Sequence, residues 1–240
     1  MIIYPDLFDI VTADKLACIR ENYEFRREGH QYNYQGTLQH QAFEKAYNVS
    51  LQSKSNIFLG ILFEICLFEH LTKKFVNDIK QTPQYAAIID SEKDAYISSQ
   101  MRNIGLSYDM TIGRTDGGHD FLINMFNGSY LRVDLKMYGR IILDSLAQAQ
   151  HCNLLVDERQ YNPQTTDAYI QGFLVRDKGV LFFYVGGMAY SQELRLGEKF
   201  NNPARFLPVN ELHNMNSFTQ AIFNKSVASH RDLYLNALQQ

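Results

Sequence analysis

The chain has 240 residues, of which 45% are hydrophobic, 20% charged and 13% aromatic. This length can bury one substantial core, and the 14 glycines and 5 prolines exclude collagen-like and low-complexity classes. Lysine and arginine number 23 against 26 acidic residues, which gives a net charge of −3. Since proteins that bind nucleic acid through bulk charge are usually basic, a polyanionic partner would have to meet a local basic patch.

Cysteine usage and apolar runs indicate the compartment. The three cysteines, Cys18, Cys66 and Cys152, are too widely spaced for a disulfide framework or a zinc motif. The segment MIIYPDLFD is too short and too acidic for a signal peptide, and the longest apolar stretch, residues 57–68, is too short for a membrane span. We therefore expect a reduced, cytoplasmic protein with no membrane partner.

In chain order, the first predicted element is a helix over residues 12–28, where apolar residues recur at helical spacing. Residues 29–54 are polar, and we expect loop and short helix there. The strongest helix begins at Ser55 or Asn56 and is apolar nearly all round, which predicts a buried helix. Pro83 lies beyond its end.

After about residue 84 the pattern changes to short runs of strand length. We predict strands near residues 106–112, 120–126, 130–137, 167–176 and 180–187. Asn127-Gly128, the strongest short-range hairpin signal, separates the second of these runs from the third. Residues 140–160 are ambiguous and expected to be partly helical, and residues 217–238 are expected to form a helix.

This order of elements predicts the fold class. A helix, an antiparallel hairpin, a helical crossover, further strands and a final helix indicate an α/β arrangement around a mixed sheet. Without internal repeats or long linkers, residues 1–240 form a single predicted domain. Within it, residues 1–54 are expected to be a helical extension packed on the core of residues 55–240.

The motif Asp134-Leu135-Lys136 ends the second strand of the predicted hairpin. Residues i and i+2 of a strand share a face, so the carboxylate and the amine project together. Such a pair can hold a divalent cation and position a water, although an exposed salt-bridged strand is the simpler interpretation. A second D-x-K sequence, residues 78–80, follows no hairpin, and we interpret it as incidental.

Asp120 opens the first strand of the hairpin, and the turn decides which face it uses. A two-residue loop would place Asp120 opposite Leu135, pointing away from Asp134. A three-residue loop or one bulge, which Gly128 could support, would place it opposite Lys136 on the shared face. A site that includes Asp120 therefore predicts a three-residue turn or a bulge.

Glu64 lies within the most apolar part of the predicted helix. A buried carboxylate is costly unless it is paired or bound to metal. One interpretation is a narrow polar stripe shared with Glu69 or water. The other is that the helix carries Glu64 to the carboxylates of the hairpin, where a divalent cation would neutralise all three acids.

The chain resembles the PD-(D/E)XK nuclease superfamily in the order and spacing of three pieces. These are Asn56-x3-Gly60-x3-Glu64, Asp120-Phe-Leu-Ile and Val133-Asp134-Leu135-Lys136, and the resemblance extends over residues 55–212. It implies a restriction-endonuclease-like central mixed β-sheet flanked by helices. It also implies that Asp120, Asp134, the Leu135 carbonyl and the auxiliary acid Glu64 bind metal, and that Lys136 is the signature lysine.

One departure from the family pattern leaves an alternative open. His119 stands where the proline before the first aspartate is usual. Asp109, in LSYDMTIG, is therefore a rival to Asp120 as the first metal-binding acid.

The resemblance implies a Mg²⁺-dependent phosphodiesterase, with Mn²⁺ as a substitute. We expect an endonuclease of restriction, defence or phage type in which the metal activates water and Lys136 orients it and offsets negative charge. An alternative is a catalytically inactive nucleic-acid-binding or assembly module on the same fold. Another is a protein-interaction domain in which Glu64 and Lys136 form a buried ion pair.

The expected partner is nucleic acid, with DNA favoured over RNA. Phosphate contacts usually come from arginine and lysine, and we favour Arg114 and Arg140 because they flank the hairpin. Other candidates are Arg26-Arg27, Lys73-Lys74, Arg102 and Arg132. A homodimer would suit cleavage of both strands of a duplex.

Overall fold

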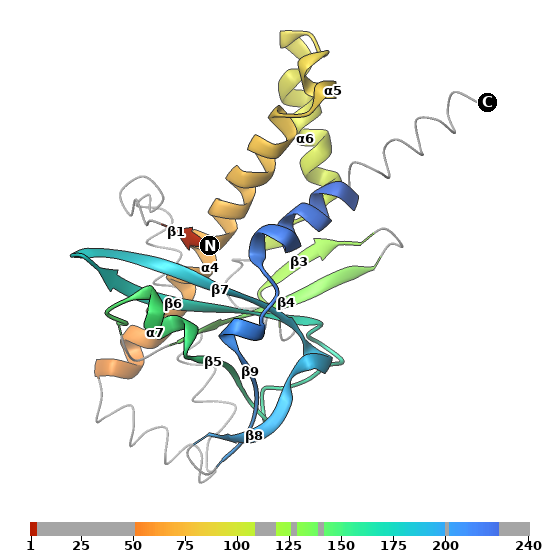
Figure 1. Cartoon of the computed structure of the whole chain (residues 1–240). Coiled ribbons are helices and arrows are strands. Elements are labelled where there is room, and N and C mark those ends of the chain that lie inside the picture. Colours follow the sequence, from red (N-terminus) through yellow and green to blue (C-terminus); the bar gives the residue numbers. More distant parts are fainter. Residues whose placement is uncertain (4–50, 109–118, 126–128, 139–141, 200–201, 226–240) are drawn as a thin grey trace.

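The computed structural model describes residues 1–3, 51–108, 119–125, 129–138, 142–199 and 202–225 (Figure 1). These residues form an α/β fold in which a curled mixed sheet lies between helices and a smaller second sheet. The general α/β class predicted from the sequence is therefore confirmed. The helix predicted over residues 12–28 lies outside the described residues.

Helix α4 (Leu51–Lys80) is the long predicted helix, extended at both ends. Side chains four residues apart form one buried stripe along it, namely Phe63, Leu67, Leu71, Phe75 and Ile79. Each is at most 1% exposed. Burying a side chain of this size stabilises the fold by about 1.5–3 kcal/mol, so this stripe fixes the helix against the sheet.

The segment after α4 is helical, whereas the sequence predicted runs of strand length from about residue 84. It contains α5 (Pro83–Ala86), the 3₁₀ turn η1 (Asp90–Glu92) and α6 (Lys93–Ile104). Helix α6 ends at Gly105, whose φ of 60° lies in the left-handed region that glycine adopts without strain. The prediction was wrong because few apolar residues mark the helical period in this polar segment.

The main sheet has six strands in the order β1-β7-β6-β4-β3-β2. Their bounds are β1 Ile2–Ile3, β2 Ser107–Tyr108, β3 Phe121–Asn124, β4 Tyr130–Met137, β6 Ala168–Asp177 and β7 Val180–Tyr190. Strands β4 and β6 are parallel and the other neighbours are antiparallel, so the sheet is mixed. All five predicted strands are present, and β4 has the predicted bounds.

A second sheet was not predicted. It consists of β5 (Asn153–Asp157), β9 (Asn202–Pro208) and β8 (Arg195–Lys199) in that order, all antiparallel. Helix α7 (Leu146–Gln150) precedes β5, so the ambiguous stretch 140–160 holds a short helix and a strand. The 3₁₀ turns η2 (Ser191–Glu193) and η3 (Val209–Glu211) flank β8 and β9.

The two faces of the main sheet carry different layers. Val133, Leu135 and Ile170 pack with α4 in the largest core cluster. The alternate residue Tyr169 packs with the second sheet, which lies below the main sheet in Figure 1. A Cβ on Gly172 of β6 would lie 2.4 Å from the Phe63 ring, so only glycine permits this approach of α4 to the sheet.

The two ends of the chain bear on earlier predictions. Residues 1–54 were predicted to be a helical extension, but residues 2–3 form β1 at the edge of the sheet. Residues 51–54 belong to α4, and residues 4–50 lie outside the described residues. Residues 215–225 are helical and pack in the same core cluster as α4, as predicted for that part of residues 217–238. None of the helices in the described ranges is long and apolar enough to cross a membrane.

Candidate metal and phosphodiester site

Asp134 and Lys136 lie on the same face of β4, as their spacing predicted. The burial of β4 alternates, with Leu131, Val133 and Leu135 buried toward α4 and the residues between them partly exposed on the other face. The Lys136 Nζ lies 2.7 Å from the Asp134 Oδ2, and the side chains are 20% and 15% exposed, respectively. The pair is therefore mostly withdrawn from water at the end of the hairpin.

The register of the hairpin excludes a two-residue turn. Phe121 pairs with Val133, and the Met125 amide donates to the Ser129 carbonyl (2.8 Å), which leaves three residues between these partners. The Asp120 amide also donates to the Val133 carbonyl (2.8 Å), so two residues of one strand oppose one of the other, as in a β-bulge.

The position of Asp120 agrees with the prediction in part. The structure has the longer turn that the site required, but Asp120 lies beside Val133 rather than opposite Lys136 as the sequence predicted. The Asp120 Oδ2 accepts a hydrogen bond from the Leu135 amide (2.7 Å). The carboxylate thus replaces a backbone acceptor of the ladder and lies at the edge of β4 next to the Asp134–Lys136 pair.

Asp120, Asp134 and Lys136 also interact through their charges. Burial lowers the pKa of Lys136. The Asp134 carboxylate, through its charge and its hydrogen bond, and the charge of Asp120 have the opposite effect, and the pKa lies above its ordinary value. Lys136 is therefore a firmly charged ammonium at neutral pH. Both aspartates lie close enough to stabilise that charge.

Glu64 lies on the side of the sheet that α4 covers, whereas Asp134 and Lys136 lie on the other face of β4. It belongs to α4, which packs against the face that bears Val133 and Leu135, and it is 4% exposed. Its Oε2 accepts a hydrogen bond from the Tyr108 hydroxyl of β2 (2.8 Å). This contact offsets part of the cost of burying the carboxylate. Among the described residues, the ion pair of Lys136 is with Asp134 and not with Glu64, as one alternative had suggested.

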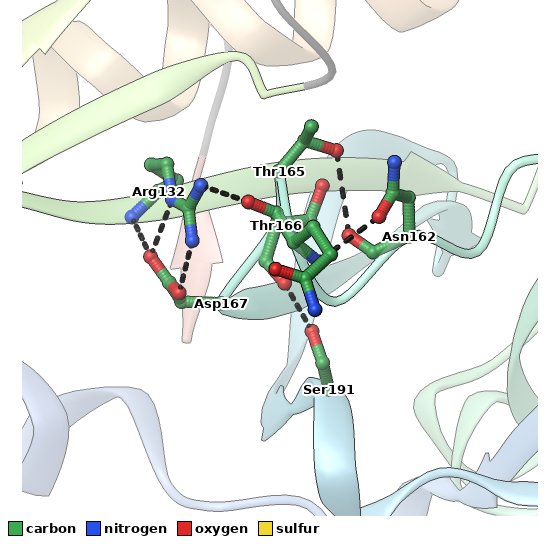
Figure 2. Close-up of polar contacts among 7 residues, drawn as sticks. Arg132, Asn162, Thr165, Thr166, Asp167 and Ser191 are labelled. Carbon is green, nitrogen blue, oxygen red and sulfur yellow. Dashed lines mark hydrogen bonds and ion pairs between the residues drawn. The ribbon is translucent and has the colours of Figure 1, made fainter.

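Arg132 is held by a second ion pair on β4 (Figure 2). Its Nη2 donates to the Asp167 Oδ1 (2.7 Å), while its Nε (2.9 Å) and its backbone amide (2.8 Å) donate to the Asp167 Oδ2. Its Nη1 also donates to the Gln164 carbonyl. This guanidinium is held against the loop before β6 by these contacts, and its suggested role as a phosphate contact stays a prediction.

The same loop is closed by further hydrogen bonds. The Thr165 hydroxyl donates to the Asn162 carbonyl (3.3 Å), and the Ser191 hydroxyl donates to the Thr166 carbonyl, as Figure 2 shows. The loop is thereby joined both to the start of β4 and to the end of β7. In this loop the hydrogen bonds and charge of Arg132 hold the pKa of Asp167 below its ordinary value.

Several predicted residues lie outside the described residues. These are Arg26, Arg27, Arg114, Arg140 and the rival acid Asp109. The second D-x-K sequence lies at the end of α4, where Asp78 accepts a hydrogen bond from Lys74 (2.8 Å), so its interpretation as incidental agrees with its helical position. The Nδ1 of His119 is buried and makes no hydrogen bond within the described part of the chain.

Two residues of β6 at the site were not singled out from the sequence. Tyr169 and Gln171 pair with Asp134 and Lys136, respectively, across the parallel ladder. The Lys136 Nζ lies 5.9 Å from the centre of the Tyr169 ring, and the Gln171 Nε2 donates to the Lys136 carbonyl (3.0 Å). Their i, i+2 spacing on a strand was visible in the sequence, but the register against β4 was not.

The donors present suit one hard divalent cation. In the described ranges, no group of three or more His, Cys, Asp and Glu side chains is placed to hold a metal ion. Mg²⁺ needs fewer protein ligands, since it commonly binds one or two carboxylates and keeps several waters. The Asp120 and Asp134 carboxylates fit that requirement. The Leu135 carbonyl adds a third oxygen, because the N–H and C=O of one strand residue point the same way.

Comparison of the chain with protein-family models, with curated proteins and with solved structures finds no match.

Proposed function

We propose that this protein is a metal-dependent nuclease of PD-(D/E)XK type that hydrolyses phosphodiester bonds, with DNA favoured as the substrate. The observation that carries the proposal is the grouping of Asp120, Asp134 and Lys136 at the end of one hairpin. Lys136 is 2.7 Å from Asp134 and its charge is stabilised by both aspartates. Two carboxylates can hold a divalent cation, and a charged amine beside them can offset negative charge on a phosphate.

The arrangement of the elements supports the same proposal. Helix α4 precedes the antiparallel strands β2, β3 and β4, and α7 lies in the connection to β6, which is parallel to β4. The main sheet has α4 on one face, and α7 and the second sheet on the other. This order of helices and strands agrees with what the resemblance implies, whereas the second sheet is an addition to it. The proposed setting in restriction, defence or phage biology rests on that resemblance.

The proposed chemistry follows from the positions of these side chains. Asp120, Asp134 and the Leu135 carbonyl would hold a divalent cation, which lowers the pKa of a bound water and stabilises charge on the phosphate. The Lys136 ammonium, beside them, would donate a hydrogen bond to the attacking water or to a phosphate oxygen and offset the negative charge that develops. Glu64 has no part in this proposal, because α4 carries it to the other face of the sheet.

A second candidate function is an inactive nucleic-acid-binding or assembly module on the same fold. The observation in its favour is that Glu64, the auxiliary acid of the resemblance, accepts a hydrogen bond from Tyr108 of β2. In this alternative the Asp134–Lys136 pair and the Asp120–Leu135 hydrogen bond are structural.

The deciding experiment is cleavage by the purified chain. Supercoiled plasmid, linear duplex, single-stranded DNA and RNA are incubated with Mg²⁺, with Mn²⁺ or with EDTA. We expect cleavage of DNA that EDTA abolishes. Binding of nucleic acid with no metal-dependent cleavage of any substrate would instead support the module.

Matched variants separate this activity from contaminants. Asp134→Asn and Lys136→Met should abolish cleavage, whereas Asp78→Asn and Lys80→Met, in the second D-x-K sequence on α4, should leave it unchanged. Calorimetry with Mn²⁺ should detect binding to the wild-type chain and not to Asp134→Asn. Full activity of either hairpin variant would overturn the proposal.

A further inference from the structure

A column of two stacked rings between two cations connects the site to the second sheet. The Lys136 Nζ lies 5.9 Å from the centre of the Tyr169 ring, and the Tyr161 ring stacks on Tyr169 with centroids 6.5 Å apart at 24°. On the Tyr161 ring lies the guanidinium of Arg205 from β9, 4.6 Å from the centroid. The Lys136 ammonium of the candidate site therefore rests on a pair of stacked tyrosine rings.

Tyr169 is held firmly in this column. It is fully buried, it pairs with Asp134 across the parallel ladder, and it belongs to the core cluster between the two sheets. Tyr161 is fixed in turn, because its hydroxyl donates to the Ser191 carbonyl (3.1 Å). The ring beneath Lys136 is thus part of the packed interior and not a mobile surface side chain.

Lys136 contacts Tyr169 on the face of its ring, since the Nζ lies over the ring. The Tyr169 hydroxyl is buried and lies near Thr166 and Asn162. The face of an aromatic ring attracts an ammonium within about 6 Å of its centroid. A lysine has four rotatable side-chain bonds, so a single contact with Asp134 would leave its Nζ several positions.

We propose that Tyr169 is a positioning residue, whose ring holds the Lys136 ammonium between itself and the Asp134 carboxylate. This inference rests on the proposed nuclease function for its consequence, because a fixed ammonium meets the same phosphate oxygen or water in each turnover. Asp134 sets one contact of the ammonium and the ring restricts its remaining freedom. Tyr161 and Arg205 keep the ring in place from the side of the second sheet.

The test replaces Tyr169 with phenylalanine and then with mono-, di- and trifluorophenylalanine, incorporated at position 169 in the full chain. These side chains have nearly the same volume, so the core remains filled, while fluorine progressively removes the negative charge from the ring face. Lys136 acylation by an amine-reactive reagent is followed by mass spectrometry, with the exposed Lys80 as the internal reference. Loss of the ring attraction should accelerate Lys136 labelling by about 2- to 30-fold.

The expected result is wild-type labelling in Tyr169→Phe and a stepwise increase along the fluorinated series. Where the chain cleaves DNA, kcat should fall by a similar factor along the series while KM stays constant. Equal labelling of Lys136 throughout the series would overturn the inference, as would fast labelling in Tyr169→Phe. If wild-type chain cleaves no substrate, the proposed function fails, but the labelling series still decides whether Tyr169 positions Lys136.

Discussion

The Asp120 carboxylate accepts a hydrogen bond from the Leu135 amide at 2.7 Å. Strand β3 begins at Phe121, which pairs with Val133, so β4 extends beyond its partner at Leu135. The Asp120 side chain supplies the acceptor that a backbone carbonyl of β3 would otherwise provide there. The same carboxylate stabilises the charge on Lys136. One aspartate therefore has a structural contact and a position in the candidate site, and different substitutions separate these two roles.

Asp120→Asn and Asp120→Ala should have different effects. The asparagine keeps an oxygen that can accept from the Leu135 amide, so its stability should stay close to that of the wild type. The alanine leaves the amide without this acceptor and should cost about 1–3 kcal/mol of unfolding free energy, measured by urea denaturation. Both variants should lose Mn²⁺ binding in calorimetry. Equal stability of the two would show that the hydrogen bond does not hold the strand.

The Asp134–Lys136 pair should couple more strongly than a surface ion pair. Lys136→Met should lower stability by about 1–3 kcal/mol, less than the loss for a fully buried pair because both groups keep some contact with water. Adding Asp134→Leu should restore part of that loss, because no charge then remains unpaired. The Lys93–Asp90 pair, at 2.6 Å with the aspartate 94% exposed, is the surface control, and its coupling energy should be smaller. Similar coupling energies in the two double-mutant cycles would contradict this prediction.

Glu64 should matter for stability and not for metal. Tyr108→Phe removes the hydroxyl that donates to the buried carboxylate and should cost about 1–3 kcal/mol of unfolding free energy. Glu64→Gln keeps an acceptor for the tyrosine and should have a smaller effect. Neither variant should change Mn²⁺ affinity, because α4 packs on the face opposite Asp134. A large loss of Mn²⁺ affinity in Glu64→Gln would place Glu64 in the metal site after all.

Two glycine-to-alanine substitutions should have opposite signs. Gly172→Ala puts a Cβ 2.4 Å from the Phe63 ring, and the overpacking should cost about 1–3 kcal/mol. Gly60→Ala, inside α4 with nothing within 4 Å of its Cβ, should stabilise the chain by about 0.5–1 kcal/mol. Thermal and urea unfolding measure both. A neutral Gly172→Ala would mean that α4 can move away from the sheet at little cost.

Acidification should weaken the Arg132–Asp167 contact. The hydrogen bonds and charge of Arg132 lower the pKa of Asp167 below its ordinary value. Since the folded-state pKa is below the unfolded one, this stabilisation is complete above about pH 5 and is lost as the pH falls through the folded-state pKa. Asp167→Asn and Arg132→Met should both flatten the pH dependence of the urea midpoint below about pH 5. Slopes as steep as that of the wild type in both variants would exclude the contribution.

Much of the hairpin could be predicted from the sequence. Asn127-Gly128 between two apolar runs marked the turn, and strand β4 has the predicted bounds, residues 130–137. The shared face of Asp134 and Lys136 followed from the two-residue period of a strand. The long buried helix could also be predicted, because its sequence is apolar nearly all round and leaves no broad polar face for solvent.

Other local structure could not be predicted. Helix α6 has few apolar side chains to mark its period, and Gly105 was its clearest signal. The second sheet is formed by short strands, and its strands β5 and β9 are distant in sequence, so their pairing depends on contacts that no local pattern records.

The sequence by itself determined the short-range features of the site: two residues of β4 on one face, an aspartate opening the neighbouring strand, and an apolar helix with one acid. Only the tertiary structure decided how these pieces meet. Packing of α4 on the face of Val133 and Leu135 directs Glu64 to Tyr108, and the parallel register of β6 brings Tyr169 under Lys136. Local periodicity sets which residues share a face, whereas long-range packing sets which face each element covers.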